Sequence, residues 1–256
     1  MLSCISRAFT LFKRSVVSIS KDICKRRLKH ASALSRLGPH KLTGGLKCPA
    51  SRIDLPMKRK LMLISNTLQS CTAHIKLYMK YGKMPLSQSK VLDVGCGYGW
   101  LLDYFEGAEK LAGVDIAHHA VEVAARRKPL RHFKQGNLEQ PIPFHETFDL
   151  VLAINIIEHL EKPEAGVRSI AGACHAGSIV LVHMPTIANA LTKWEYSKLY
   201  DSDPTHIYRP SGKTVRKIFE ANGFTTLRDS YLPHYPAWAT KIYPLHPAYL
   251  AVFKKN

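Results

Sequence analysis

A glycine-rich segment directly after an apolar run most constrains how this chain can fold. Residues 91–100 read Val-Leu-Asp-Val-Gly-Cys-Gly-Tyr-Gly-Trp, with three glycines at alternate positions. The apolar run predicts a buried strand, and the glycines predict a tight turn that opens a helix over residues 101–106. Glycine is required there because a Cβ would oppose the positive φ angles of such a turn and block a ligand from the backbone. The segment therefore predicts a ligand-binding strand–turn–helix unit.

A second apolar run supplies an acidic residue beside this turn. Residues 111–116 read Leu-Ala-Gly-Val-Asp-Ile and predict a second strand, near whose end lies Asp115. In a strand–turn–helix–strand unit this carboxylate lies next to the glycines, where it can accept hydrogen bonds from both hydroxyls of a ribose. The spacing G-x-G-x-G, followed by Trp100, departs from the dinucleotide fingerprint and disfavours NAD or FAD. The two segments together predict a nucleoside site.

These residues resemble the motifs of the class I S-adenosylmethionine-dependent methyltransferases, in which the first strand carries D-x-G-x-G-x-G and the second ends in Asp or Glu. The resemblance implies S-adenosyl-L-methionine as the cofactor. It also implies an α/β fold, a Rossmann-like seven-stranded mostly parallel sheet with helices on both faces and its last strand antiparallel, over residues 85–256. The alternative is a doubly wound domain whose glycines only allow close helix packing.

The resemblance also assigns residues to the cofactor. The glycines and Asp93 would hold the methionine moiety and ribose, Asp115 the ribose hydroxyls, and Asn137 or the backbone of Leu138 the adenine. The implied cofactor-binding set is Asp93, Gly95, Cys96, Gly97, Gly99, Asp115, Ile116, Asn137, Leu138 and Asn155.

The remaining pattern predicts alternating strands and helices. Further strands are expected at 131–138, 148–154, 177–185, 224–232 and 249–254, and helices at 117–127, 163–174 and 211–223. An amphipathic helix over 58–81 is expected either to cover the substrate or to pack on the sheet. Residues 186–210 are expected to form a long irregular loop of the acceptor site, since such loops are usually functional. Residues 231–247 form a second aromatic insertion, so a flat or apolar acceptor is expected.

Catalytic candidates follow the fourth expected strand, where open α/β sheets bind their ligands. Glu158-His159-Leu160 resembles the ubiquinone-biosynthesis O-methyltransferases and their relatives, a group that includes the small-RNA 3′-end methyltransferases. Some of these hold a divalent cation with E-x-x-E-H, but Asn155 replaces the first Glu here, so no metal is expected. His159 and Glu158 are assigned an acid–base or acceptor-orienting role, with a structural role as the alternative.

His206 is a third catalytic candidate. It follows Thr205, and this Thr-His pair before a helix is common in the same methyltransferase group. The alternative is a helix-flanking histidine that is hydrogen-bonded to nearby backbone.

Charge is concentrated at the N-terminal end. Residues 1–60 hold 15 lysines and arginines against Asp22 and Asp54, a net +13 of the chain's +18. Residues 1–56 therefore read as a basic leader, residues 57–84 as the N-terminal helix and residues 85–256 as the methyltransferase domain. Projected as a helix, residues 1–21 are amphipathic and basic, typical of a mitochondrial targeting presequence. One alternative is a disordered basic tail, or a true start of translation at Met57. Another is an arm that binds a membrane surface or nucleic acid.

The combined hypothesis is a methyltransferase that acts on a small-molecule acceptor, by O-methylation of a phenol- or quinol-like compound. A tRNA or rRNA methyltransferase is the first alternative, although no N-P-P-Y-type tetrapeptide follows the fourth strand; a non-catalytic methyltransferase-fold partner subunit is the second. No apolar run approaches the length of a membrane span, and the six cysteines form no C-x-x-C pair. A cytoplasmic location is expected, or the mitochondrial matrix in a eukaryote.

Overall fold

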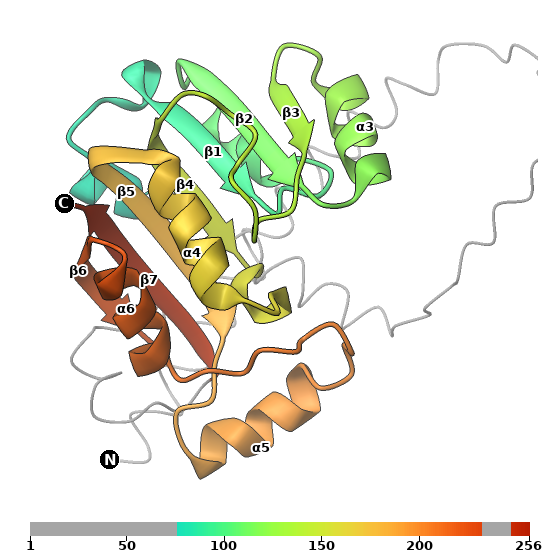
Figure 1. The fold of residues 1–256 in the computed structure, drawn as a ribbon, viewed down its shortest axis with the longest axis vertical. Coiled ribbons are helices and arrows are strands. Elements are labelled where there is room, and N and C mark those ends of the chain that lie inside the picture. Colours follow the sequence, from blue (N-terminus) through green and yellow to red (C-terminus); the bar gives the residue numbers. More distant parts are fainter. Residues whose placement is uncertain (1–75, 232–246) are drawn as a thin grey trace, which may run out of the picture. The chain divides into compact units, whose positions relative to one another are not determined.

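The described part of the chain is built on one seven-stranded sheet. The computed structural model describes residues 76–231 and 247–256. The strand order is β3-β2-β1-β4-β5-β7-β6, and β7 pairs antiparallel with both β5 and β6 while the other neighbours pair parallel (Figure 1). This is the Rossmann-like sheet expected from the sequence, with its last strand antiparallel, so the predicted fold class is confirmed.

The strands and helices have the following bounds. The strands are β1 Lys90–Val94, β2 Lys110–Asp115, β3 His132–Gln135, β4 Phe148–Ile154, β5 Cys174–Pro185, β6 Phe224–Ser230 and β7 Ala248–Lys255. The α-helices are α3 His118–Arg127, α4 Pro163–Gly172, α5 Ala190–Leu199 and α6 Gly212–Ala221, and the 3₁₀ helices are η1 Leu86–Gln88, η2 Leu101–Phe105 and η3 Ile157–His159. Residues 76–81 are also helical.

Successive side chains of a strand point to opposite faces of the sheet. Both faces of this sheet carry apolar side chains, and both are covered by other elements. On β1, Leu92 and Val94 join the core under α4 and α6, whereas Val91 joins the core formed with residues 76–81 and η2. Figure 1 shows α4 and α6 side by side on one face of the sheet. The central strands are therefore buried on both faces, which accounts for the nearly unbroken apolar run of β4.

The expectation of an irregular loop over residues 186–210 is wrong, because the segment contains α5 (Figure 1). Asn189 caps this helix: its side chain accepts from the backbone N–H of Thr192, and Thr192 in turn accepts from the backbone N–H of Asn189. Only Thr192 and Tyr196 are buried along the helix. An apolar periodicity strong enough to predict a helix is therefore missing from the sequence.

Two smaller expectations also change. Residues 101–105 form a 3₁₀ helix rather than the expected helix to residue 106, and the chain turns at Gly107 with φ +96°. The third strand ends at Gln135, so residues 136–138 lie beyond it. The leader, most of the helix predicted over 58–81 and most of the second aromatic insertion lie outside the described residues. Within the described residues, no helix is long and apolar enough to cross a membrane.

Candidate cofactor and acceptor site

The glycine turn after β1 has the backbone conformation that its sequence predicts. Gly95, Gly97 and Gly99 have φ angles of +75°, +49° and +69°. A Cβ at Gly95 would lie 2.6 Å from the side chain of Ile156, and one at Gly99 would lie 2.8 Å from the ring of Phe133. A Cβ at Gly97 would meet no atom within 4 Å. The outer two glycines therefore allow close packing, whereas Gly97 leaves its backbone open to a ligand.

Asp115, at the end of β2, is bound to this turn. Its Oδ2 accepts from the backbone N–H of Gly97 at 2.7 Å, and its Oδ1 accepts from that of Ala117 at 2.9 Å. A carboxylate offers about four acceptor positions, so both oxygens keep capacity for further donors. The position beside the turn is the one predicted for a carboxylate that binds a ribose.

Asp93 lies beneath the turn in β1 and is almost fully buried. Burial, followed by the negative charge of Asp115, raises the pKa of Asp93 to about 8. A negative charge close to a poorly solvated carboxyl group disfavours ionisation of that group. The Asp93 carboxyl group therefore keeps its proton to a higher pH than an exposed aspartate does.

The other residues predicted to bind the cofactor differ in how exposed their side chains are. Cys96 is buried, whereas Ile116 is 64% exposed. Asn137 uses its side-chain oxygen locally, to accept from the backbone N–H of Glu139. Leu138 packs in the core under α4. The side chains of Cys96 and Leu138 therefore pack inside the protein.

Asn155 follows β4 and has the one positive φ found among non-glycine residues of the described part, +52°. Its backbone N–H donates to the carbonyl of His183 at 2.7 Å, and Nδ1 of His183 donates to its Oδ1 at 3.0 Å. Strained backbone of this kind clusters at functional sites. His183, which the sequence analysis did not single out, thus joins Asn155 at the carboxyl edge of the sheet.

Glu158 lies in η3 and is fully buried. Neither of its carboxylate oxygens has a hydrogen-bond partner among the described residues. Burial, with the charge of Asp203 as a smaller cause, raises the pKa of Glu158 to about 8. An unpartnered buried carboxyl group is costly, so it calls for a functional explanation.

His159 and His206 are brought together beside Glu158. Their ring centroids are 4.8 Å apart, and Nδ1 of His159 donates to the carbonyl oxygen of Thr205 at 3.0 Å. The backbone N–H of Tyr208 donates to the carbonyl oxygen of Glu158 at 2.9 Å. Burial, and then the neighbouring His159, lowers the pKa of His206. The three catalytic candidates from the sequence therefore form one cluster.

Two tyrosines flank this cluster. The rings of Tyr200 and Tyr196 lie 6.0 and 6.3 Å from the ring of His206, and the Tyr196 hydroxyl lies 3.4 Å from its Nδ1. Both tyrosines come from the α5 region. One side of the cluster is therefore aromatic.

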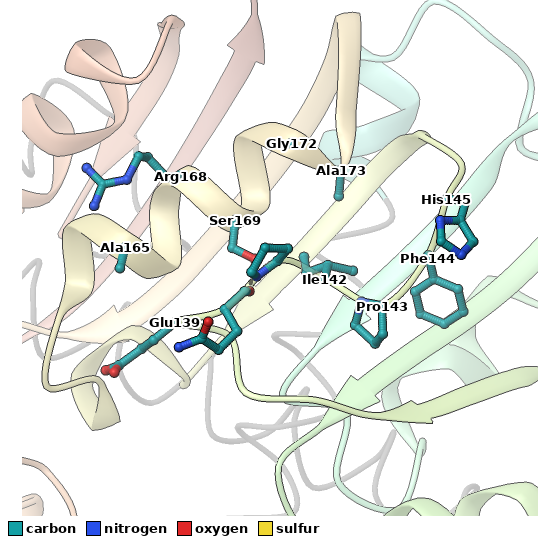
Figure 2. A pocket seen from close by; sticks show the side chains of 12 residues that line it. Glu139, Ile142, Pro143, Phe144, His145, Ala165, Arg168, Ser169, Gly172 and Ala173 are labelled. Atoms are coloured by element: carbon teal, nitrogen blue, oxygen red, sulfur yellow. Dashed lines mark hydrogen bonds between the residues drawn. The ribbon is translucent and has the colours of Figure 1, made fainter.

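A groove on the outer side of α4 is separate from these residues. Figure 2 shows it between the segment 139–145 and α4, with Pro143 and Phe144 on one side and Ala165 and Ser169 on the other. None of the predicted cofactor or catalytic residues lines it. The candidate site is therefore defined by its side chains at the carboxyl edge and not by this groove.

Comparison with known proteins agrees with this sheet and turn. A family model described as a methyltransferase domain matches residues 32–228. The chain therefore belongs to this methyltransferase family, and its class is that of the S-adenosylmethionine-dependent methyltransferases.

Relatives agree on the class but differ in the acceptor that their names state. A phosphatidylethanolamine N-methyltransferase from Cereibacter sphaeroides is 25% identical over 44% of this chain and 64% of its own length. A mitochondrial ubiquinone biosynthesis O-methyltransferase from Schizosaccharomyces pombe is 35% identical over 30% of this chain and 31% of its own length. The matches thus span less than two thirds of these relatives.

Solved structures share the fold. The magnesium protoporphyrin IX methyltransferase of Synechocystis, solved with bound SAH, superposes with a TM-score of 0.55 at 18% identity. The match covers 73% of this chain and 83% of that one.

The residues of this chain fit S-adenosylmethionine. Gly97 leaves an open approach to its backbone, and Asp115 presents a carboxylate with spare acceptor positions at the same place. Asp93, in the strand that leads into the glycine turn, adds a buried carboxyl group whose ionised form would be stabilised by a cationic ligand. When bound, the cofactor supplies a methyl group on a sulfonium, which is already a good leaving group.

Proposed function

We propose that the chain transfers the methyl group of S-adenosylmethionine to the hydroxyl of a small phenol- or quinol-like acceptor. The observation that carries this proposal is the buried, unpartnered Glu158 carboxyl group with His159 and His206 beside it. A hydroxyl acceptor must lose its proton. A group close by is therefore needed that accepts this proton or stabilises the negative charge left on the oxygen. The protein otherwise only has to align donor and acceptor and exclude water.

The cofactor side of the proposal uses the glycine turn. Gly95, Gly97 and Gly99 with Asp93 bind the methionine moiety and ribose, and Asp115 binds the ribose hydroxyls. Asn137 or the backbone of Leu138, together with the backbones of Cys96 and Ile116, borders the adenine.

The acceptor side lies on the segment between β5 and α6. Asn155 faces the reaction centre from the end of β4, and its bond to His183 fixes its side chain. Tyr200 lies beside His206 and is only partly buried, so it can offer apolar surface to an aromatic ring, while the buried Tyr196 packs behind His206. The O-methyltransferase relatives support this choice, whereas the N-methyltransferase relative does not.

The test is a transfer assay with radiolabelled S-adenosylmethionine and the full-length chain. The acceptor panel contains catechols, quinols, phosphatidylethanolamine vesicles, and tRNA and rRNA transcripts. We expect label on a catechol or quinol and a loss of at least about tenfold in kcat for Glu158→Gln, with cofactor affinity unchanged. Label on RNA alone would establish the RNA methyltransferase alternative instead. Cofactor binding without transfer to any acceptor would point to the partner-subunit alternative.

We also infer that residues 1–21 direct the protein to mitochondria if its source is a eukaryote. The support is the amphipathic, basic composition of this segment. Residues 1–50 fused to a fluorescent protein are expected to co-localise with mitochondria, and a fusion that stays in the cytosol would refute the inference.

A further inference from the structure

Arg127, the last residue of α3, reaches the glycine turn after β1 from the side. Its Nε donates to the carbonyl oxygen of Tyr98 at 3.2 Å, and its Nη2 donates to that of Gly99 at 2.6 Å. A single side chain thus binds two successive carbonyl groups of the turn. Bonds to two neighbouring peptide groups fix the orientation of both.

The two halves of this turn, residues 95–99, are held by different elements. The backbone N–H groups of its first three residues donate to Val114 and Asp115 of β2. Among the described residues, the backbone of its last two residues is bonded from outside the turn only by Arg127 and, at 3.5 Å, by Arg131. The second half of the turn therefore depends on arginine side chains for its position.

The guanidinium of Arg127 is itself held in place by Asp103 of η2. Its Nη1 donates to Oδ2 of Asp103 at 2.6 Å, and Arg131 donates to the other oxygen of the same carboxylate at 2.7 Å. The side chain of Arg127 is only 18% exposed and that of Arg131 only 6%. Charge-assisted hydrogen bonds of this kind are stronger than neutral ones. They fix the guanidinium as a rigid support for the turn.

Trp100 covers the flat side of this guanidinium. The central carbon of the Arg127 guanidinium lies 4.1 Å from the centroid of the Trp100 ring, although Trp100 is 59% exposed. Stacking on an aromatic ring leaves the in-plane N–H donors of an arginine free, so one guanidinium can stack and also bind three oxygen atoms. Trp100, the residue that sets the turn apart from a dinucleotide fingerprint, therefore belongs to the same support.

We propose that Arg127 is a positioning residue for S-adenosylmethionine, which holds the second half of the glycine turn in its binding conformation before the cofactor arrives. A turn with three glycines would otherwise sample many conformations, and ordering it on binding would lower the affinity. Arg127 acts through the turn and not through the ligand. The proposal rests on the cofactor side of the proposed function and is independent of the choice of acceptor.

The test separates cofactor affinity from stability in the full-length chain. Arg127→Met keeps a long, helix-forming side chain but removes every donor, whereas Arg127→Lys keeps the charge but loses the planar fork of donors. Arg126→Met is the matched control, because Arg126 precedes Arg127 in α3 and pairs with Glu122 one turn earlier on the same helix. Calorimetric titration with S-adenosylmethionine measures affinity, and urea unfolding measures stability. Amide hydrogen exchange of a peptide covering residues 95–101 measures opening of the turn.

We expect both Arg127 variants to bind S-adenosylmethionine at least about tenfold more weakly than the wild type, under conditions in which all the proteins are folded. In the cofactor-free variants the peptide 95–101 should exchange about tenfold faster, and saturating cofactor should restore slow exchange. The Arg126 variant should match the wild type in both measurements. Arg127→Lys keeps the test valid if Arg127→Met does not fold.

A purely structural role for Arg127 gives a different result. Lower stability of both Arg127 variants, with the affinity and exchange of the wild type, would overturn the proposal. A wild-type chain that binds S-adenosylmethionine but methylates neither catechol nor quinol would count against the proposed acceptor and leave the affinity comparison intact. Absence of binding by the wild type would refute the cofactor assignment and this proposal with it.

Discussion

Asn155 and His183 are joined by two hydrogen bonds, one from the Asn155 backbone N–H to the His183 carbonyl and one from the imidazole Nδ1 to the Asn155 side chain. The pair links the ends of β4 and β5. It holds a non-glycine residue at φ +52° where the two strands end.

Replacing Asn155 separates its backbone role from its side-chain role. Asn155→Gly keeps the positive φ at little cost, whereas Asn155→Ala should be less stable than Asn155→Gly by about 1 kcal/mol. Both variants lose the side-chain bond to His183 but keep the backbone one, so both should lose methyl transfer to a similar degree. Urea unfolding and the transfer assay provide the measurements. Equal stability of the two variants would show that the backbone is not strained at this position.

Cofactor affinity should depend on the Asp115 carboxylate. Asp115→Asn retains one acceptor oxygen and turns an NH₂ group toward a backbone N–H donor, so affinity should fall about tenfold or more. Calorimetric titration with S-adenosylmethionine measures the change. Asp149→Asn is the matched control, since Asp149 also accepts from a backbone N–H, that of Lys90, but lies at the amino end of β4. A comparable loss in both variants would contradict the assignment.

The three glycines should respond differently to alanine. Gly99→Ala places a Cβ 2.8 Å from the Phe133 ring and should cost about 1–3 kcal/mol of stability beyond the effect of φ. Gly97→Ala meets open space, so its stability loss should be limited to about 1 kcal/mol while cofactor binding is largely lost. Thermal unfolding and calorimetry distinguish the two effects. Full cofactor affinity in Gly97→Ala would remove Gly97 from the site.

The buried Asp93 should make the cofactor-free protein less stable as pH rises. Its folded-state pKa is raised from 3.8 to about 8, so between these values the folded protein holds a proton that the unfolded chain has lost. The free energy of unfolding should therefore fall with a slope of up to about 1.4 kcal/mol per pH unit and level off above pH 8. Glu158, whose pKa is also raised to about 8, contributes a slope of the same sign. Asp93→Asn should therefore lower the slope in urea unfolding between pH 5 and 8 by the contribution of Asp93 and leave that of Glu158.

Asp103→Asn provides the control for that experiment. The pKa of Asp103 is lowered by its bonds to Arg127 and Arg131, with burial acting in the opposite sense. Its contribution to stability is present above the ordinary pKa and is lost only at more acidic pH. The variant should therefore be uniformly less stable across pH 5–8. An unchanged slope in Asp93→Asn would contradict the assignment to Asp93.

The sheet and the cofactor turn were predictable because their signals are local. Apolar runs such as that of β4 set the strands, and the glycines with Asp115 lie within two adjacent segments. The helix α5 was not predictable from apolar periodicity, since Trp194 and Leu191 are exposed along it. Its Asn189–Thr192 capping pair was the one available signal.

Glu158, His159 and His206 were singled out one by one from the sequence, but their grouping was not predicted and His183 was missed. His183 comes beside Asn155 only through the β4–β5 pairing, in which Ile154 lies opposite His183. His206 reaches η3 through the bond between His159 and Thr205, a contact between segments 46 positions apart. Sequence patterns report neighbours along one element, whereas these contacts depend on tertiary packing.

The segment between β5 and α6 bears on how proteins of this fold could come to accept different molecules. The residues proposed to bind the donor lie at the carboxyl ends of β1 and β2, whereas His206, Tyr196 and Tyr200 belong to the segment between β5 and α6, outside the sheet. Under the proposed function, exchanging this stretch would change the choice of acceptor without changing the residues that bind S-adenosylmethionine.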